Sequence, residues 1–329
     1  MNKIETALNI LRQMVRPAPR PLWALWSAEN VKVVAYELAR QRLNGTHSRH
    51  DYVNRPAPNE RLGSMTCASS DWDSQWLPYW AAHMQMQPAL HRKIWEFAFI
   101  AQVLQSRDLL QPGRRGLGFG CGREPLASIF AARGCSILAT DLAPQDDRAR
   151  QWTCGDQHAD SAEHIRVPSL CPDESALNLR FRPVDMNHLP DDLHGEFDFC
   201  WSSCALEHLG SIEHGLQFIR ASTRCLRPGG VAVHTTEFNL ERSRILDQHP
   251  TVLFRMTDFE RLARSLASEG VRLHPVLERP GDAFLDSYVD TPPYPDPASV
   301  GSTLSMLHLR LTVASFRTTS VGLVLEKSI

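Results

Sequence analysis

A glycine-dense turn lies near the middle of the chain, in the segment Gly116-Leu117-Gly118-Phe119-Gly120-Cys121-Gly122-Arg123-Glu124-Pro125-Leu126. Apolar residues precede the turn and a helical pattern follows it, so the segment is predicted to run from a strand into a helix. Glycine is favoured where the backbone turns tightly and where a ligand approaches without a Cβ in the way. The N–H groups at the helix start then face the same pocket. An ordinary strand-to-helix connection has the same pattern, so a second feature is needed to choose between the two.

A carboxylate at the end of the next predicted strand supplies that second feature. Residues 136–140 form the strand, and Asp141 follows it, nineteen positions after Gly122. An acid at this place, about 20 residues beyond the glycine turn, is suited to hydrogen-bond the two ribose hydroxyls of a nucleoside. A helix cap or a solvated strand end is the alternative, and neither explains the spacing. The two features together predict a nucleoside-binding site.

Short apolar runs alternate with helical patterns from Gly116 to the C-terminus. Seven runs are predicted to be strands, at residues 116–120, 136–140, 179–184, 197–202, 230–236, 271–277 and 319–326. Helices are expected between them, at about 124–133, 211–226 and 257–269. This alternation predicts crossover connections and a mainly parallel sheet with helices on both faces. The fold class is therefore α/β, with a doubly wound sheet of seven strands.

The N-terminal part of the chain has a different pattern. Helices are predicted at residues 3–15, at 28–43 and from Pro88 to Leu104. An irregular stretch lies between the second and third of these helices, and it ends in four aromatic residues, Trp72, Trp76, Tyr79 and Trp80. We therefore divide the chain into a helical cap and substrate-side segment, residues 1–104, and a cofactor-binding catalytic domain, residues 105–329.

The composition excludes several classes of protein. With 43% apolar and 22% charged residues among 329, the chain is typical of globular proteins. A net charge of -2 without any long basic run argues against a nucleic-acid partner. No apolar stretch approaches the roughly 20 residues that span a bilayer. Because the eight cysteines form no C-x-x-C pair and the N-terminus lacks a signal-peptide pattern, we expect a cytoplasmic protein with reduced thiols.

Three further segments continue the pattern in order. They are Val184-Asp185-Met186, Phe197-Asp198-Phe199-Cys200-Trp201-Ser202-Ser203-Cys204-Ala205-Leu206-Glu207-His208 and Cys225-Leu226-Arg227-Pro228-Gly229-Gly230-Val231. With these landmarks the chain resembles the class I S-adenosylmethionine-dependent methyltransferases, which have a Rossmann-like fold. The resemblance implies that S-adenosylmethionine is the cofactor. It also implies a set of cofactor-binding residues: Gly118, Gly120, Gly122, Glu124, Asp141, Leu142, Asp185, Met186, Ser202 and Ser203.

The chain departs from the family pattern at two positions. Gly118 stands where the family commonly has an acid, which removes a usual partner of the cofactor's amino-acid portion. Glu124 stands where the family often has glycine, and its carboxylate is placed to replace that partner. The alternative for Glu124 is a first-turn acid that the helix dipole favours.

A more particular resemblance extends over five segments: Trp95-Glu96-Phe97, residues 118–126, Glu207-His208-Leu209-Gly210, His234-Thr235-Thr236-Glu237-Phe238-Asn239 and Tyr288-Val289-Asp290. These segments resemble a bacterial subgroup whose members accompany glycosyltransferases in surface-polysaccharide gene clusters. The resemblance implies a role in polysaccharide biosynthesis and a sugar or glycan precursor as the methyl acceptor.

Candidate catalytic residues are expected just beyond strands four and five, because ligands of open α/β sheets lie at the carboxyl ends of the strands. His208 follows the fourth strand, and histidine titrates near neutral pH, as a general base must. Glu237 ends the fifth strand and is the second candidate base. The alternatives are a packed histidine at a helix start and a carboxylate that holds a loop amide.

Aromatic residues are the candidates for acceptor binding. Trp76 and Tyr79 can stack on a sugar ring, and Tyr288 and Tyr294 lie in the long irregular segment 280–305. Packing of the rings against the catalytic domain is the alternative for the first pair, and a surface excursion is the alternative for the segment. No metal is expected, since the pairs Asp146-Asp147 and Asp191-Asp192 are typical of solvated loops.

Other functions remain open at this stage. A nicotinamide-dependent oxidoreductase needs G-x-G-x-x-G or G-x-G-x-x-A, and no register of the glycine turn fits that pattern. A methyltransferase-like fold that acts only as a partner protein is one rival. A carboxyl or amine acceptor is another, and the sequence does not define the oligomeric state.

Overall fold

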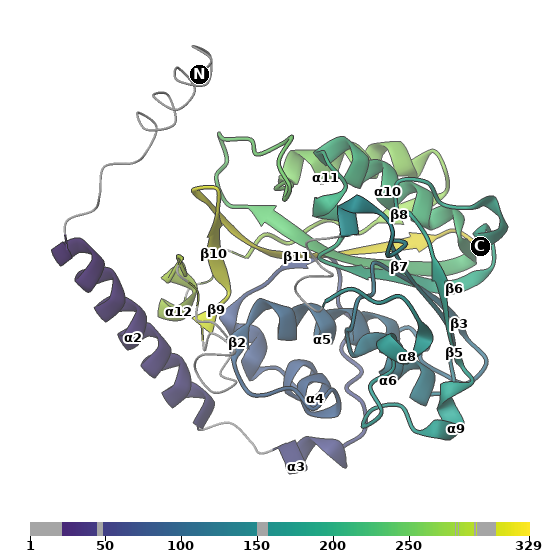
Figure 1. Ribbon diagram of the computed structural model, residues 1–329, viewed down its shortest axis with the longest axis horizontal. Coiled ribbons are helices and arrows are strands. Elements are labelled where there is room, and N and C mark those ends of the chain that lie inside the picture. Colours follow the sequence, from purple (N-terminus) through teal and green to yellow (C-terminus); the bar gives the residue numbers. More distant parts are fainter. Residues whose placement is uncertain are drawn as a thin grey trace, which may run out of the picture.

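The computed structural model describes residues 22–44, 49–149, 157–279, 281, 283–292, 294 and 307–329. A mixed sheet crosses this part of the chain, and helices cover both of its faces (Figure 1). The predicted helix at 3–15 lies outside the described residues, as does much of the predicted loop 280–305. Among the described helices, none is both long and apolar enough to cross a bilayer.

Five parallel strands form the half of the sheet that carries the glycine turn. Their order is β5-β4-β3-β6-β7, so the winding direction reverses between β3 and β6. The strands are β3 (Arg115–Phe119), β4 (Ser136–Asp141), β5 (Leu179–Pro183), β6 (Phe197–Ser203) and β7 (Leu226–Asn239). A reversal of this kind leaves a crevice beyond the carboxyl ends of the two strands, which is where ligands of such sheets bind.

The long strand β11 (Phe316–Lys327) closes the other side of the sheet by running antiparallel to β7. Three short strands share the outer edge of β11, namely β8 (Val271–Leu273), β1 (Met65–Thr66) and β10 (Arg310–Val313). The sheet therefore has nine strands, and the doubly wound α/β fold is confirmed. The two extra strands, β1 and β10, are short. β1 pairs with a segment far away in the sequence, whereas β10 forms a hairpin with β11, which follows it directly.

Two apolar layers hold the helices against the sheet. On one face, α5 (Arg92–Gln105) lies so close that a Cβ on Gly322 of β11 would come within 2.2 Å of Phe99. On the other face, α10 (Ile212–Arg224) and α11 (Met256–Ala267) bury apolar stripes that include Phe218 and Phe259. Apolar residues at helical spacing predict this arrangement, since the apolar face of each helix must be buried away from water.

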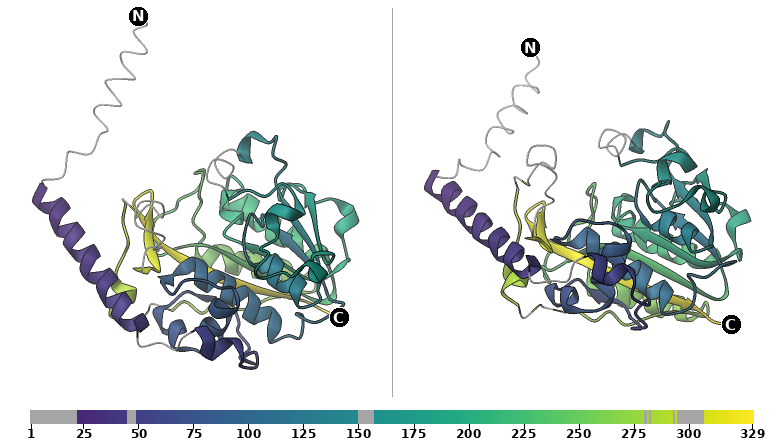
Figure 2. Two further views of the ribbon diagram at one scale, coloured as in Figure 1. Left: turned by 60° about the horizontal axis from the view of Figure 1, so that its bottom comes forward. Right: turned by 90° about the horizontal axis from the view of Figure 1, so that it is seen from below.

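The remaining elements surround these layers (Figure 2). The helices are α2 (Leu22–Asn44), α3 (Arg49–Val53), α4 (Trp76–His83), α6 (Leu126–Ala132), α8 (Ala162–Ile165), α9 (Asp173–Ala176) and α12 (Phe284–Ser287). Short 3-10 helices occupy Ser69–Asp73, Asp147–Ala149, Asp191–Leu193 and Leu206–His208. A separate two-stranded parallel sheet joins β2 (Leu90–His91) to β9 (Leu307–His308). The division at residues 104 and 105 stays a prediction, although β1 adds a piece of the N-terminal segment to the sheet.

Candidate active site

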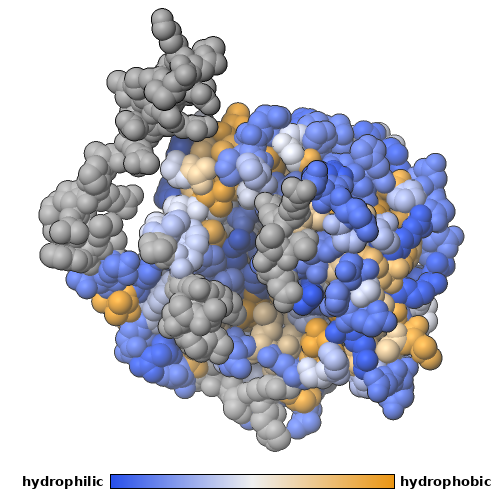
Figure 3. All heavy atoms as spheres, viewed as in Figure 1, coloured by the Kyte–Doolittle hydropathy of each residue, from blue (hydrophilic) through white to orange (hydrophobic). Residues whose placement is uncertain are grey.

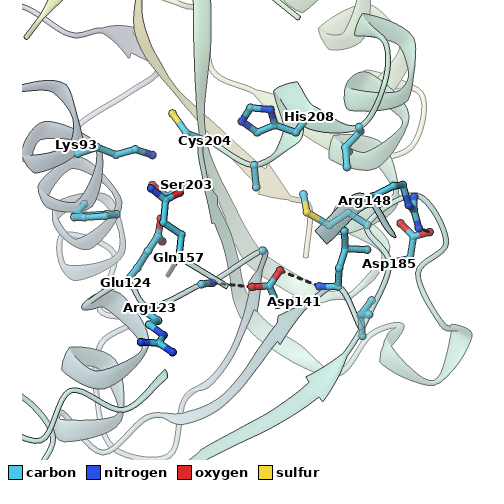
Figure 4. A pocket seen from close by; sticks show the side chains of 18 of the residues that line it. Lys93, Arg123, Glu124, Asp141, Arg148, Gln157, Asp185, Ser203, Cys204 and His208 are labelled. Carbon is cyan, nitrogen blue, oxygen red and sulfur yellow. Dashed lines mark hydrogen bonds and ion pairs between the residues drawn. The ribbon is translucent and has the colours of Figure 1, made fainter. Parts of the chain in front are cut away.

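A cavity of about 690 Å³ opens at the carboxyl ends of the parallel strands. The face of the molecule seen in Figure 3 is predominantly hydrophilic, with scattered apolar residues. The lining of the cavity comes from the glycine turn, the ends of β4, β5 and β6, and the first turns of α5. Figure 4 shows Arg148 and Asp185 at one end of the cavity and Lys93 with Glu124 at the other, with Asp141 and His208 between them.

The glycine turn forms the wall nearest to β3, and it requires glycine at two positions. Gly120 and Gly122 have φ values of 56° and 50°, in the left-handed region that disfavours side chains. A Cβ on Gly122 would also come within 2.5 Å of the carbonyl oxygen of Gln157. Both glycines line the cavity, so a ligand can approach the backbone there.

Gly118 has different surroundings from Gly120 and Gly122. Among the described residues that line the cavity, Gly118 is absent. A Cβ at this position would lie 2.3 Å from Cys121 Sγ and 2.4 Å from the ring of Trp201. Gly118 is therefore small because it packs against the interior beneath the turn, and its contact with the cofactor stays a prediction.

Asp141 lies at the end of β4 and is held by backbone donors. Its Oδ2 accepts hydrogen bonds from the N–H groups of Gly122 at 3.2 Å and Ala159 at 3.3 Å, and its Oδ1 accepts one from Leu142 at 2.8 Å. Burial raises the pKa of Asp141 above its ordinary value, and these donors oppose that shift. Asp141 and Leu142 both line the cavity, as the sequence spacing predicts for a nucleoside partner.

Asp185 and Met186 follow β5 and form one end of the cavity. Asp185 accepts hydrogen bonds from Arg148 Nη2 at 2.9 Å and from the N–H of Asn187 at 2.9 Å. Burial raises the pKa of Asp185, but the hydrogen bonds from Arg148 and Asn187 outweigh it, so the pKa lies below its ordinary value. Arg148 is a lining residue that the sequence interpretation missed, because it belongs to no motif.

Glu124 stands at the start of the helical segment and carries an unusual carboxyl group. Burial raises the pKa of Glu124 to about 8, with Lys93 opposing the shift and Glu96 adding to it. Its buried Oε2 atom has no hydrogen-bond partner within the described part of the chain. A buried carboxyl oxygen without a hydrogen-bond donor destabilises the protein when no ligand is bound, and it favours the binding of a cationic or hydrogen-donating ligand.

A charged cluster under this end of the cavity also escaped the sequence interpretation. Lys93 Nζ lies 3.0 Å from Glu96 Oε2, and Arg92 Nη1 lies 3.2 Å from Glu96 Oε1. Glu96 is fully buried, and although burial raises its pKa, the two cations hold it at about 2. The signal in the sequence is the spacing of Arg92, Lys93 and Glu96, three charges within five positions at the start of an otherwise apolar helix.

The two adjacent serines at the end of β6 face opposite sides of the sheet. Ser203 lines the cavity, whereas Ser202 is fully buried and its Oγ lies 2.8 Å from His234 Nδ1. His234 is in turn 3.0 Å from Ser222 Oγ, so it joins β6, β7 and α10. The Ser202 side chain therefore points away from the cavity, because successive side chains of a strand alternate between its two faces.

His208 lies where a base for the cavity is needed. Its ring borders the cavity, and its Nδ1 lies 2.8 Å from the carbonyl oxygen of Pro250 (Figure 4). Because a carbonyl only accepts, Nδ1 of a neutral ring carries the proton, and Nε2 is the atom that can take one up.

Glu237, the other predicted base, is held in an ion pair. Its Oε1 lies 2.5 Å from Arg92 Nη2, and its Oε2 accepts a hydrogen bond from Thr318 at 2.8 Å. Glu237 is buried and does not belong to the described lining of the cavity. Glu237 is therefore bound by the guanidinium of Arg92 on α5, and its role as a base stays a prediction.

Cys204, Glu207 and Glu237 bring one sulfur and two carboxylate groups within 4.8 Å of one another. Such a group can hold a metal ion, but Arg92 lies among these residues, with Nη1 3.6 Å from Cys204 Sγ. The guanidinium thus supplies positive charge where a metal ion would. The acidic pairs singled out in the sequence bind arginines instead: Asp146 pairs with Arg148, and Asp192 pairs with Arg182.

The four predicted acceptor-binding aromatics do not belong to the described lining of the cavity. Trp76 and Tyr79 belong to α4 and are buried in the core, where this helix packs against α5. Tyr288 OH lies 3.3 Å from Asp290, and Tyr294 OH donates to the carbonyl oxygen of Thr312 at 3.0 Å. The position of Trp76 and Tyr79 agrees with the alternative interpretation, in which the rings pack against the catalytic domain, since large aromatic rings are most stable when they are buried.

Comparisons with known proteins match the part of the chain that contains the lining of the cavity. A family model described as a methyltransferase domain matches residues 64–269, more than half of the chain. A ubiquinone biosynthesis O-methyltransferase from Methylococcus capsulatus is 28% identical over 135 residues, which are 41% of this chain and 48% of that protein. The chain thus spans about half the length of that curated relative.

Solved structures with a similar arrangement are more distant in sequence. A magnesium protoporphyrin IX methyltransferase from Synechocystis, solved with bound SAH, is 11% identical with a TM-score of 0.42, over 70% of this chain and 82% of that one. A SAM-dependent methyltransferase from Aquifex aeolicus is 12% identical with a TM-score of 0.38, over 69% and 88% of the two chains.

Proposed function

The chain belongs to the class I S-adenosylmethionine-dependent methyltransferase family, and from this premise we propose that it transfers the cofactor's methyl group to a hydroxyl of a sugar or glycan precursor. The observation that carries the proposal is the cavity itself. Asp141 and the glycine turn lie along one part of its wall, and His208 lies on another. One site therefore combines groups for a nucleoside with a group that can accept a proton.

The residues of the cavity fit S-adenosylmethionine. The left-handed turn at Gly120 and Gly122 brings the backbone to the cavity wall, and a Cβ at either position would collide with a neighbouring lining residue, Ala205 or Gln157. Asp141 would hold the ribose hydroxyls, and Asp185 with Met186 would hold the adenine. The unpartnered Oε2 of Glu124 would receive the ammonium of the amino-acid portion, which matches a buried carboxyl that lacks a donor.

The bound cofactor supplies a methyl group that is already activated on a sulfonium. The protein must therefore position an acceptor oxygen in line and exclude water, which can lower a barrier by about 7–11 kcal/mol. His208 Nε2 would accept the proton of the acceptor hydroxyl, a contribution of about 10²- to 10⁴-fold. The hydrogen bond from Nδ1 to Pro250 keeps the ring in the tautomer that this step needs.

A carboxyl or amine acceptor, or a partner protein without activity, is the rival function. A carboxylate needs no base at neutral pH, so loss of the His208 imidazole would not slow its methylation. A non-catalytic partner would bind the cofactor and transfer nothing. The class of acceptor can therefore be tested by combining product detection with one histidine variant.

The test is mass spectrometry of nucleotide sugars and oligosaccharides after incubation with the protein and cofactor. We expect one acceptor to gain the mass of a single methylene unit, and tandem spectra to place it as an ether on a hydroxyl. Asp141→Ala provides the matched control, because it should lose cofactor binding and product together. Methylation of a carboxyl or amine alone, or cofactor binding without any product, would overturn the proposal.

A further inference from the structure

Two histidines from distant parts of the chain stand side by side, and the first of them, His91, lines the cavity. His91 ends β2 and His308 ends β9, and the two are direct partners in the parallel pairing of these strands. Their rings stack with centroids 4.8 Å apart and planes 22° apart. His91 lines the cavity together with Lys93 and Phe97, on the side away from Asp185.

A buried carboxylate orients the second histidine. Asp290 is fully buried, and its Oδ2 lies 2.8 Å from His308 Nδ1. Lys32 Nζ is 3.1 Å from Oδ1, and the hydroxyls of Tyr36 and Tyr288 also donate to this carboxylate. Burial raises the pKa of Asp290, but His308 and Lys32 outweigh it and the pKa lies below its ordinary value. Asp290 is therefore ionised, so Nδ1 of His308 donates its proton to it, and in the neutral ring Nε2 has the lone pair.

The first histidine has the opposite arrangement. His91 caps α5, because its Nδ1 accepts a hydrogen bond from the N–H of Lys93 at 3.1 Å. Burial, with His308 adding to it, lowers the pKa of His91 to about 3, so the ring stays neutral. Its proton is therefore on Nε2. In the part of the chain that the structure describes, neither Nε2 atom has a hydrogen-bond partner.

The pair thus combines one neutral donor, His91 Nε2–H, with one acceptor, His308 Nε2. A hydroxyl both donates and accepts hydrogen bonds, so it can satisfy the two atoms together. A carboxylate has only acceptors and an ammonium has only donors, so either one would leave one imidazole nitrogen unsatisfied. The cations next to the pair do not change this preference, since Arg92 and Lys93 are already bound to Glu96.

We propose that His91 and His308, oriented by Asp290, form a hydroxyl-binding subsite for a polyhydroxylated acceptor. It holds a hydroxyl other than the one that is methylated, and it rests on the proposed function. Tyr294 packs edge-on against His308, with ring centroids 5.1 Å apart, and supports the imidazole from another side. The subsite selects acceptors with at least two hydroxyls and positions the reacting one.

The tautomers and the binding can be tested before the natural acceptor is known. The full chain, labelled with ¹⁵N-histidine and saturated with S-adenosylhomocysteine, is followed by long-range ¹H–¹⁵N correlation. We expect a protonated Nδ1 on His308 and a protonated Nε2 on His91. Methyl glucoside, galactoside and mannoside are the probes, and tetrahydropyran, the same ring without hydroxyls, is the control. At least one glycoside should shift both Nε2 signals, and tetrahydropyran should not. Opposite tautomers, or no shift with any glycoside, would overturn the proposal.

Two variants then separate recognition from folding, using the acceptor found by mass spectrometry. His308→Asn keeps a donor near Asp290 but lacks Nε2, whereas His308→Gln places an amide near the position of Nε2. We expect His308→Asn to raise the acceptor KM about three- to tenfold at unchanged cofactor affinity, and His308→Gln to restore part of that loss. An unchanged KM in His308→Asn overturns the subsite and leaves the proposed function standing. Shifts of both Nε2 signals without methyl transfer to any acceptor would overturn the proposed function and leave the subsite standing.

Discussion

Asp141 Oδ2 accepts a hydrogen bond from the N–H of Gly122 at 3.2 Å, so the carboxylate that ends β4 holds the glycine turn that follows β3. Ala159 donates to the same oxygen at 3.3 Å. One carboxylate therefore joins three segments around the cavity before any ligand arrives. Pre-organisation of this kind lowers the entropic cost of binding.

Asp141→Ala should weaken cofactor binding. The variant removes a charged acceptor of two ribose hydroxyls and the anchor of the turn, which together should cost on the order of 2–4 kcal/mol. Isothermal titration with S-adenosylhomocysteine measures the change. Asp192→Ala, whose carboxylate pairs with Arg182 outside the described lining of the cavity, is the control and should bind as the wild type does. Unaltered affinity in Asp141→Ala would remove the ribose assignment.

Cofactor affinity should rise with pH because of Glu124. Burial raises the pKa of Glu124 to about 8, so the carboxyl is mostly protonated at neutral pH. A cationic ammonium favours the ionised form, and binding below that pKa must therefore release a proton. We expect the association constant to increase from about pH 6 to about pH 7.5, with less change in Glu124→Gln. Titration in buffers of different ionisation enthalpy measures the released proton, and wild-type binding without proton release would refute this role.

His208→Gln should slow methylation of a hydroxyl without affecting the cofactor. The amide cannot take up the proton, so turnover should fall by about 10²- to 10⁴-fold. Single-turnover assays with the identified acceptor measure the chemical step, and titration checks that cofactor affinity is retained. His214→Gln, on the following helix, is the matched control. If turnover is retained in His208→Gln, another group accepts the proton.

Glu237→Gln should act mainly on stability. It leaves the buried guanidinium of Arg92 without one of its two carboxylates, and breaking such a pair costs about 3–5 kcal/mol. Urea denaturation measures the loss in the free energy of unfolding. The double variant Arg92→Met, Glu237→Gln should lose less stability than the sum of the two single variants. Each single substitution leaves the charge of the other residue without its partner, and the double variant removes both charges.

The same variant separates the ion pair from the base that the sequence predicts. A catalytic Glu237 would lose turnover at an unchanged free energy of unfolding. If Glu237→Gln is as stable as the wild type but inactive, the ion-pair interpretation fails.

Local patterns in the sequence predict much of the fold and part of the site. The seven predicted strands and the helices between them appear close to their expected bounds, because hydrophobic period and turn residues act over a few positions. The glycine turn and Asp141 meet for the same reason. The two features belong to one local unit, which consists of a strand, a turn, a helix and the next parallel strand. Because this unit is short, its own residues determine its geometry.

Contacts between distant segments followed only from the tertiary structure. The ion pair of Arg92 with Glu237 and the stack of His91 on His308 each join residues that no local spacing relates. Ser202 and Ser203 differ because the pleat sends neighbours to opposite faces, and only packing decides which face borders the cavity. The chain's local chemistry thus determined the cradle for the nucleoside. The packing of α5 and β9 against it decided which charges are paired and which imidazoles stack, since burial and pairing depend on the whole sheet.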